Sequence, residues 1–169
     1  MDVNKGDATD TNYRSRLVGR EFNVGRDDAL HAATPPLEAL RVVISHAATH
    51  SQGGTRRSVM VNDVRRAYFY AKIQRDVYIE LPQMHGKMLG KRKLCLYGTR
   101  DAAKGWQETL SAHMETIGFR RGKGHPCVFH HPSRDIKTLV HGDDYFSAGS
   151  DESMYWREAE LAKAYEIQT

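Results

Sequence analysis

Apolar residues recur with two different periods along the chain, which predicts a mixture of helices and strands. Three segments, 34–49, 101–118 and 150–165, carry apolar side chains at three- and four-residue steps, the period of an amphipathic helix. Each segment opens with a residue that suits a helix N-cap: Thr34, Asp101 and Ser150. Gly118 is well placed to end the second helix.

Short runs rich in β-branched and aromatic residues predict strands between the helices. These runs are 16–22, 59–64, 77–81, 127–129, 138–140 and 145–148. The first dozen residues read as a flexible leader, and the glycine- and lysine-rich stretch 83–95 reads as a mobile connection. The order of elements favours an α+β fold with a small antiparallel sheet backed by helices, for which the ferredoxin-like split βαβ is the compact version.

Composition narrows the class of protein. A chain of 169 residues suits one domain or slightly more, and 40% hydrophobic residues allow a core, which argues against wholesale disorder. Two cysteines, Cys95 and Cys127, fit a reducing compartment, although one bridge stays open as an alternative. The N-terminus lacks a signal-peptide pattern, and no run of about 18 apolar residues predicts a membrane span. We therefore expect an intracellular protein, cytoplasmic or nuclear, that is neither secreted nor bound to a membrane.

Charge is distributed unevenly around a net value of +4. Lys and Arg dominate residues 58–137, whereas Asp and Glu dominate residues 138–169. A basic segment beside an acidic one suits a polyanionic partner and a carboxylate cluster for metal ions. Basic loops that are merely solvated give the same pattern, so charge alone leaves both readings open.

Three aspartates are the strongest candidates for chemistry. Asp143 and Asp144 lie on a turn between two apolar runs, and Asp63 closes the run that begins at Val59. Carboxylates at the ends of neighbouring strands can hold two Mg²⁺ ions about 3.5–4 Å apart, the arrangement used for displacement at phosphorus. Magnesium needs only one or two protein carboxylates. Aspartate is also a favoured turn residue, so the paired turn is ambiguous when taken alone.

A second cluster could suggest zinc, because Cys127 lies near three histidines. No second ligand pair stands at zinc-finger spacing, so structural or solvent-exposed roles are favoured. The histidines of this cluster are His125, His130 and His131.

Several blocks of sequence, taken in order, resemble the reverse transcriptase of copia-type LTR retrotransposons. The string Asp63-Val64-Arg65-Arg66-Ala67-Tyr68 and the string His141-Gly142-Asp143-Asp144 resemble motifs A and C of reverse transcriptases. The other blocks are 15–22, similar to a fingers strand; 76–82; 94–106, similar to the family's Leu-Tyr-Gly block with its downstream Trp; and 118–129. The resemblance runs from about Arg14 to Gly149.

This resemblance implies an RNA-directed DNA polymerase that uses Mg²⁺, or Mn²⁺, with residues 58–169 as a palm-type segment and residues 1–57 as a partial fingers segment. Asp63 and Asp143 would bind both metals, and Asp144 would assist. The implied partners are a primed RNA or DNA template, deoxynucleoside triphosphates and other parts of a Gag-Pol-type polyprotein. The implied nucleotide-binding positions are Arg16, Arg20, Arg66, Ala67, Tyr68 and Gly98.

Tyr68 has the most specific implied role, because its ring would clash with a ribose 2′-hydroxyl and so select deoxynucleotides. A core tyrosine packing beside Phe69 is the alternative. The chain departs from the family pattern at His141 and Gly142, where an aromatic and a hydrophobic residue are usual, at 99–103, which lacks a proline, and at His125, where aspartate is common. No thumb or RNase H segment is expected. Two alternatives therefore stay open: a catalytically inactive retroelement remnant, and a small basic RNA-binding module.

Overall fold

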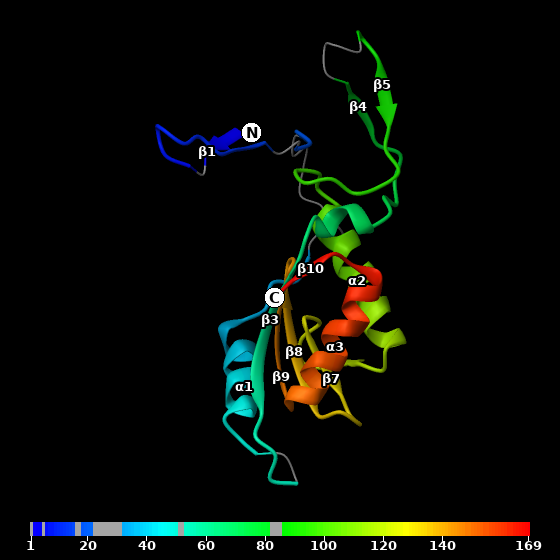
Figure 1. Ribbon diagram of the computed structural model, residues 1–169. Coiled ribbons are helices and arrows are strands. Elements are labelled where there is room, and N and C mark those ends of the chain that lie inside the picture. Colours follow the sequence, from blue (N-terminus) through cyan, green and yellow to red (C-terminus); the bar gives the residue numbers. More distant parts are fainter. Residues whose placement is uncertain (1, 5, 16–17, 22–31, 51–52, 82–85) are drawn as a thin grey trace.

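A six-stranded antiparallel sheet forms the centre of the computed structural model, which describes residues 2–4, 6–15, 18–21, 32–50, 53–81 and 86–169. The strand order is β10-β3-β9-β8-β7-β6 (Figure 1). The strands are β3 (Ser58–Val64), β6 (Arg120–Arg121), β7 (Val128–His131), β8 (Ile136–His141), β9 (Asp144–Gly149) and β10 (Ile167–Gln168).

Helices cover both faces of this sheet. Helices α2 (Ala102–Thr116) and α3 (Asp151–Ala164) lie on one face, and α1 (Leu37–Ala47) lies on the other (Figure 1). Side chains alternate between the two faces along each strand. In β8, Ile136 and Val140 therefore join the core under α2 and α3, whereas Leu139 packs with Val43 of α1. In the chain, β6 and β7 come between α2 and β8, and they form the outer side of the sheet. With these two outer strands set aside, the sheet and its helices follow the order β3, α2, β8, β9, α3, β10, which is strand–helix–strand–strand–helix–strand.

The larger core fills the space between the sheet and helices α2 and α3. Trp106, Leu110 and Met114 lie on one face of α2, at most 1% exposed, and pack with Tyr145 of β9. Burying side chains of this size contributes roughly 1.5–3 kcal/mol each. The apolar spacing in the sequence therefore builds the layer that supports the hairpin between β8 and β9.

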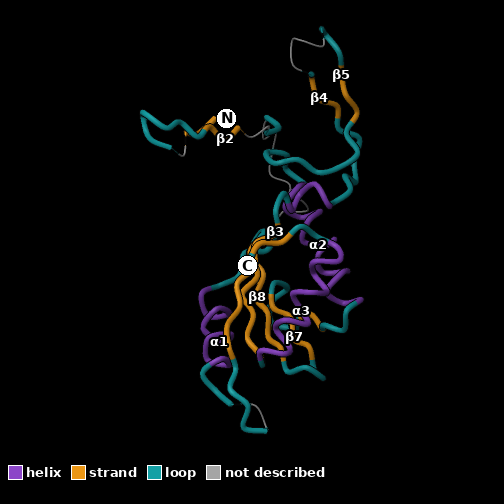
Figure 2. The backbone as a smooth tube through the Cα atoms, in the orientation of Figure 1, coloured by secondary structure: helices purple, strands orange, loops and turns teal. Residues whose placement is uncertain are grey.

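Two small ribbons project away from the sheet (Figure 2). One pairs β1 (Asp2–Asn4) with β2 (Tyr13–Ser15), and the other pairs β4 (Tyr78–Glu80) with β5 (Leu89–Lys91). The short 3-10 helix η2 (Ala67–Tyr70) connects β3 to the second ribbon and contacts α2. None of the helices among the described residues is long and apolar enough to cross a membrane.

The predicted helices and the predicted hairpin are confirmed, with small shifts at their ends. Helix α1 has Pro36 rather than Thr34 at its N-cap, while Asp101 and Ser150 stand at the N-caps of α2 and α3 as expected. Ser150 Oγ accepts from the Ser153 N–H group, whereas Asp101 makes no side-chain capping bond. Gly118 follows α2 with a φ of 94°, a conformation that favours glycine. Mixed helices and an antiparallel sheet are therefore present, and the assignment of the sheet to a polymerase palm stays a prediction.

Other local predictions differ from the structure. Residues 18–21 form no strand, and the rest of the predicted strand 16–22 lies outside the described residues. The expected leader contributes β1 and the loop that joins it to β2, and the Asp7 carboxylate closes this loop by accepting from the backbone N–H groups of Thr9 and Asp10. The expected connection 83–95 contributes β5, because Leu89–Lys91 finds a partner strand in β4; residues 83–85 lie outside the described residues. Strands β6 and β10 are too short to show periodicity in the sequence.

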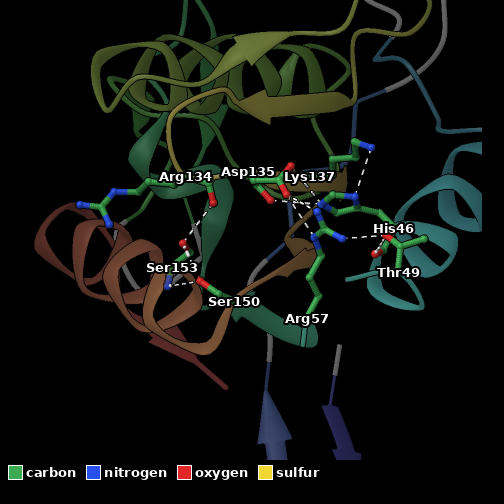
Figure 3. Close-up of polar contacts among 8 residues, drawn as sticks. All are labelled: His46, Thr49, Arg57, Arg134, Asp135, Lys137, Ser150 and Ser153. Carbon is green, nitrogen blue, oxygen red and sulfur yellow. Dashed lines mark hydrogen bonds and ion pairs between the residues drawn. The ribbon is translucent and has the colours of Figure 1, made fainter. Parts of the chain in front are cut away.

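A polar cluster fastens α1 to the end of the sheet that lies away from the β8–β9 turn (Figure 3). The His46 side chain is 5% exposed, and its Nε2 lies 3.1 Å from the Asp135 carbonyl oxygen. Lys137 Nζ lies 3.2 Å from His46 Nδ1, and Arg57 is paired with the Asp135 carboxylate. Because an ammonium group can only donate, Nδ1 accepts and Nε2–H donates, which is the neutral form of histidine.

We expect the protein to lose stability as the pH falls from 7.5 to 5.5. Burial is the main cause that lowers the pKa of His46, and the charges of Lys137 and Arg57 lower it further. Burial also lowers the pKa of His113 and His131. The unfolded chain, with histidine pKa values near ~6.5, then binds more protons than the folded chain, so this stability is present above that pH and is lost below it.

Urea denaturation at several pH values measures this effect as a falling midpoint. The variant His46→Gln should show a flatter pH dependence than the wild type between pH 7.5 and 5.5. The matched variant His130→Gln, which removes an exposed histidine, should keep the wild-type slope. Equal slopes in all three proteins would contradict the assignment to His46.

Candidate functional site

A row of polar residues crosses the sheet at the β8–β9 turn. Asp63 of β3 lies directly opposite Asp144 of β9, and Asp144 lies opposite His141 of β8. Directly opposed residues of an antiparallel pair have Cβ atoms about 4.5–5.5 Å apart on one face. Alternation from Phe146 and Leu139, which pack with α1, places the row on the α1 face of the sheet. The pairing of β3 with β9 therefore brings together two aspartates that are distant in sequence.

Asp143 joins these two residues from the turn itself. The two-residue loop Gly142-Asp143 connects β8 to β9, and Gly142 has a φ of 64°. A positive φ at the first central position is where glycine is needed in a tight hairpin turn. The backbone N–H of Val64 donates to the Asp143 carbonyl oxygen at 3.0 Å, which ties the turn to the end of β3. The tight turn thus explains the glycine at position 142, where the copia-type reverse transcriptases that the sequence resembles usually have a hydrophobic residue.

The charges of Asp143 and Asp63 act on the Asp144 carboxyl group. The pKa of Asp144 is raised, mainly by burial and then by the charges of Asp143 and Asp63, while His141 acts in the opposite direction. Like charges raise a carboxyl pKa in this way only when they lie close together. The three predicted residues therefore share one negative site.

The same site offers oxygen ligands of the kind that Mg²⁺ prefers. Within the described part of the chain, no set of three His, Cys, Asp or Glu side chains is gathered that could hold a metal ion. Magnesium is commonly held by one or two carboxylates, with phosphate oxygens and waters completing its shell. Asp63 and Asp144, which lie opposite each other, supply two carboxylates and so meet this smaller requirement in number and in kind.

Trp106 of helix α2 holds the β8–β9 turn through a hydrogen bond. Its indole Nε1–H donates to the Gly142 carbonyl oxygen at 2.7 Å, and its side chain is buried in α2. A buried indole N–H usually finds an acceptor, and here the acceptor is the turn that carries the aspartates. The apolar spacing of α2 predicted that Trp106 is in the core, but it gave no sign of this bond.

Tyr68 lies between the aspartate turn and the Leu-Tyr-Gly block. Its ring is half-buried, and its centroid is 4.5 Å from that of Tyr97. Burial raises the pKa of Tyr68, and the charge of Asp143 raises it further. Tyr68 also lines a cavity of about 40 Å³ together with Trp106 and Gly142. The structure therefore places Tyr68 near Asp143, with one side packed on Tyr97.

Two other predicted nucleotide-binding residues, Arg66 and Ala67, differ in their exposure to solvent. Arg66 has a φ of 56°, and its exposed side chain forms an ion pair with Glu166. Ala67 is fully buried at the start of η2. Arg66 can bind another anion only by sharing or leaving Glu166, which also binds Arg65 at 3.0 Å.

Gly98 has a packing role in the structure. Its φ is 85°, and a Cβ there would overlap the Gly19 carbonyl group. Gly19 N–H donates to the Tyr97 carbonyl oxygen at 2.7 Å, so the segment 18–21 lies against the Leu-Tyr-Gly block. Arg20 in this segment is exposed, and Arg16 lies outside the described residues.

Two residues of the Cys/His cluster, Cys127 and His131, are packed in the protein interior. Cys127 is a free, buried cysteine whose Sγ lies 3.2 Å from the Ala33 carbonyl oxygen. His131 is buried, bonds the Ile117 carbonyl oxygen through Nε2 at 3.1 Å, and packs on Phe119 and Trp156. These contacts agree with the structural reading of the cluster.

Arg157 is a residue of this region that sequence reasoning missed. It lies on α3 under the sheet, is fully buried, and donates through Nη2 to Asn62 Oδ1. Met154 and Leu161, at positions three before and four after it, are buried on the same face. This spacing was the available signal, because it places a guanidinium group on a core-facing stripe.

Comparison with known proteins finds relatives among retrotransposon polyproteins. The chain is 25% identical to a retrovirus-related Pol polyprotein from transposon TNT 1-94 of Nicotiana tabacum, in an alignment of 175 positions that covers 96% of the chain. It is 32% identical to the transposon Ty1-DR4 Gag-Pol polyprotein of Saccharomyces cerevisiae, in an alignment of 82 positions that covers 46% of the chain. The matches span 13% and 5% of these relatives. No family model matches the chain. These similarities support a retroelement origin.

Proposed function

We propose that the chain is the fingers-palm part of a reverse transcriptase, an RNA-directed DNA polymerase that extends a primer 3′-hydroxyl with deoxynucleotides. The observation that carries the proposal is the register of β3 and β9, which places Asp63 opposite Asp144 beside Asp143. The connectivity supports it, because β3, α2, β8, β9, α3 and β10, without the outer strands β6 and β7, follow the order of the ferredoxin-like split arrangement. The retroelement relatives support it independently.

In this proposal, each part of the site has a separate task. Asp63, Asp143 and Asp144 hold divalent cations, which lower the pKa of a primer hydroxyl and neutralise phosphate charge when bound. Burial and the charges of Asp143 and Asp63 raise the pKa of Asp144, and a cation at the site would favour its ionised form. Trp106 and the Val64 amide hold the turn in place. Tyr68, which is close enough to Asp143 for its charge to raise the tyrosine pKa, would contact the incoming sugar.

The partners follow from the same chemistry and belong to the proposal. A primed RNA or DNA template would lie across the α1 face of the sheet at the aspartate row. On the β4–β5 ribbon, exposed Tyr78 offers a ring for base contacts, with Lys91 Nζ 5.8 Å from its centroid. Lys91 is paired with Asp76 at 2.8 Å, so a phosphate contact would share or replace that carboxylate. Other parts of a Gag-Pol-type polyprotein are further proposed partners.

Primer extension on poly-rA/oligo-dT tests the function, with Mg²⁺ or Mn²⁺ added. Because the chain spans a small part of its relatives, addition of a single nucleotide is the suitable readout, since it needs no processive grip on the duplex. Metal-dependent addition supports the polymerase. Metal binding without addition indicates an inactive remnant, and template binding that needs no metal indicates a basic RNA-binding module.

A further inference from the structure

Arg157 is an energetically unfavourable residue for its place in the core. It is fully buried, and within the described part of the chain its Nε and Nη1 atoms have no hydrogen-bond partner. Burial lowers the pKa of Arg157 to about 10, so the group still carries its charge at neutral pH. A buried charge that lacks full pairing lowers stability, and an apolar side chain of similar size is often better tolerated.

The contacts that Arg157 does make are with one cross-strand pair. Its Nη2 donates to Asn62 Oδ1, and its guanidinium carbon lies 5.9 Å from the centre of the Tyr145 ring. Asn62 and Tyr145 are both fully buried and lie directly opposite each other in β3 and β9. They are also the immediate neighbours of Asp63 and Asp144, which form the next pair in the ladder. The Arg157 side chain therefore contacts both β3 and β9 directly beside the opposed carboxylates of Asp63 and Asp144.

The Asn62 side chain is fixed on its other side as well. Its Nδ2 donates to Thr169 Oγ1 at 2.7 Å, so both ends of the amide group are engaged. Rotation of Asn62 would break bonds to α3 and to the residue after β10 together. Because successive side chains in a strand point to opposite faces, a shift of Asn62 and Tyr145 under α3 moves Asp63 and Asp144 on the α1 face.

We propose that Arg157 is a positioning residue that holds the Asn62–Tyr145 pair and thereby sets the separation of the Asp63 and Asp144 carboxylates for a divalent cation. The inference rests on the proposed function, because it assigns the cation to these carboxylates. It also explains why a destabilising group occupies a core position. Arg157 lowers the stability of the fold, and in return it fixes the geometry of the site.

Three variants of the full chain test this role. Arg157→Met keeps the length of the side chain and removes its charge and donors, whereas Arg157→Lys keeps the charge and loses the fork that spans both contacts. Met154→Leu is the matched control, because Met154 is buried on the same helix and packs near Gly149, five ladder steps from Asp144. A volume-conserving exchange of this kind disturbs a core only slightly.

The measurements separate positioning from general stability. Mn²⁺ binding, followed by the electron paramagnetic resonance of the free ion, should weaken at least about tenfold in Arg157→Met and by an intermediate factor in Arg157→Lys. Urea denaturation should show Arg157→Met to be as stable as the wild type or more stable. Met154→Leu should bind Mn²⁺ like the wild type.

A second readout works in the metal-free protein. The Val64 amide, which donates to Asp143, should exchange hydrogen at least about tenfold faster in Arg157→Met, whereas the Val140 amide, which donates to the Cys127 carbonyl oxygen, should not change. Unchanged Val64 exchange in a folded Arg157→Met protein would overturn the inference, as would equal Mn²⁺ affinity. If the wild type binds no Mn²⁺, the proposed function fails, and the exchange data alone decide the role of Arg157. If Arg157→Met does not fold, Arg157→Lys decides it by the same measurements.

Discussion

Replacing Asp63 or Asp143 with asparagine should reduce single-nucleotide addition by about a thousandfold or more. Each change keeps the size of the side chain and removes a negative oxygen ligand from the site. A bound divalent cation supplies several kcal/mol of charge stabilisation in phosphoryl transfer, and about 4 kcal/mol corresponds to a factor of a thousand in rate. The initial rate of dTTP addition to oligo-dT on poly-rA, with Mg²⁺ in excess, measures this loss.

Stability measurements distinguish this loss of activity from a loss of folding. Because burial and, after it, neighbouring charges raise the pKa of Asp144, its ionised form is disfavoured in the folded protein, and Asp144→Asn should raise the urea midpoint at pH 7.5. Asp151→Asn is a matched control, since Asp151 is exposed and binds Ser58 at the other end of β3. Retained activity in Asp63→Asn or Asp143→Asn would exclude the aspartate row as the catalytic centre, and a similar loss in Asp151→Asn would show a general effect.

From the sequence, the helices that support this site could be predicted, whereas the geometry of the site itself could not. Helices α2 and α3 follow from apolar spacing and from caps, because burial of one face is a local periodic property. The pairing of Asp63 with Asp144 depends on the register between β3 and β9, which residues far apart in the chain determine together. Ordered sequence blocks indicated that these residues belong together, but not which of them lie opposite one another.

The Trp106–Gly142 bond and the burial of Arg157 show why the sequence did not reveal the contacts that support the site. The bond from Trp106 to the Gly142 carbonyl requires a helix and a turn to meet at 2.7 Å, and neither segment carries a local pattern for the other. Arg157 violates the expected polarity of its helix face, so a reading based on polarity assigns it to the surface. Local rules fail most often at functional or strained positions, which makes such a violation informative once the structure is known.

A second prediction concerns Tyr68 and the proposed binding of a nucleotide beside it. Replacing Tyr68 with valine should reduce discrimination against ribonucleotides by about a hundredfold, which corresponds to roughly 2.7 kcal/mol. If the ring lies against the incoming sugar, a smaller side chain leaves room for the 2′-hydroxyl group. The ratio of kcat/KM for dTTP to that for UTP on poly-rA/oligo-dT measures the change.

The controls at this position separate sugar selection from packing. Tyr68→Phe keeps the ring that packs 4.5 Å from Tyr97 and removes only the hydroxyl, so it should keep the discrimination of the wild type. Tyr97→Leu removes the ring beneath Tyr68, and it should lower discrimination less than Tyr68→Val does, because the Tyr68 ring is still present. If Tyr68→Val lowers kcat/KM for both nucleotides by the same factor, Tyr68 acts by packing alone. A selective gain for UTP requires the ring to meet the sugar, and this requires the nucleotide to lie between Tyr68 and the aspartate turn.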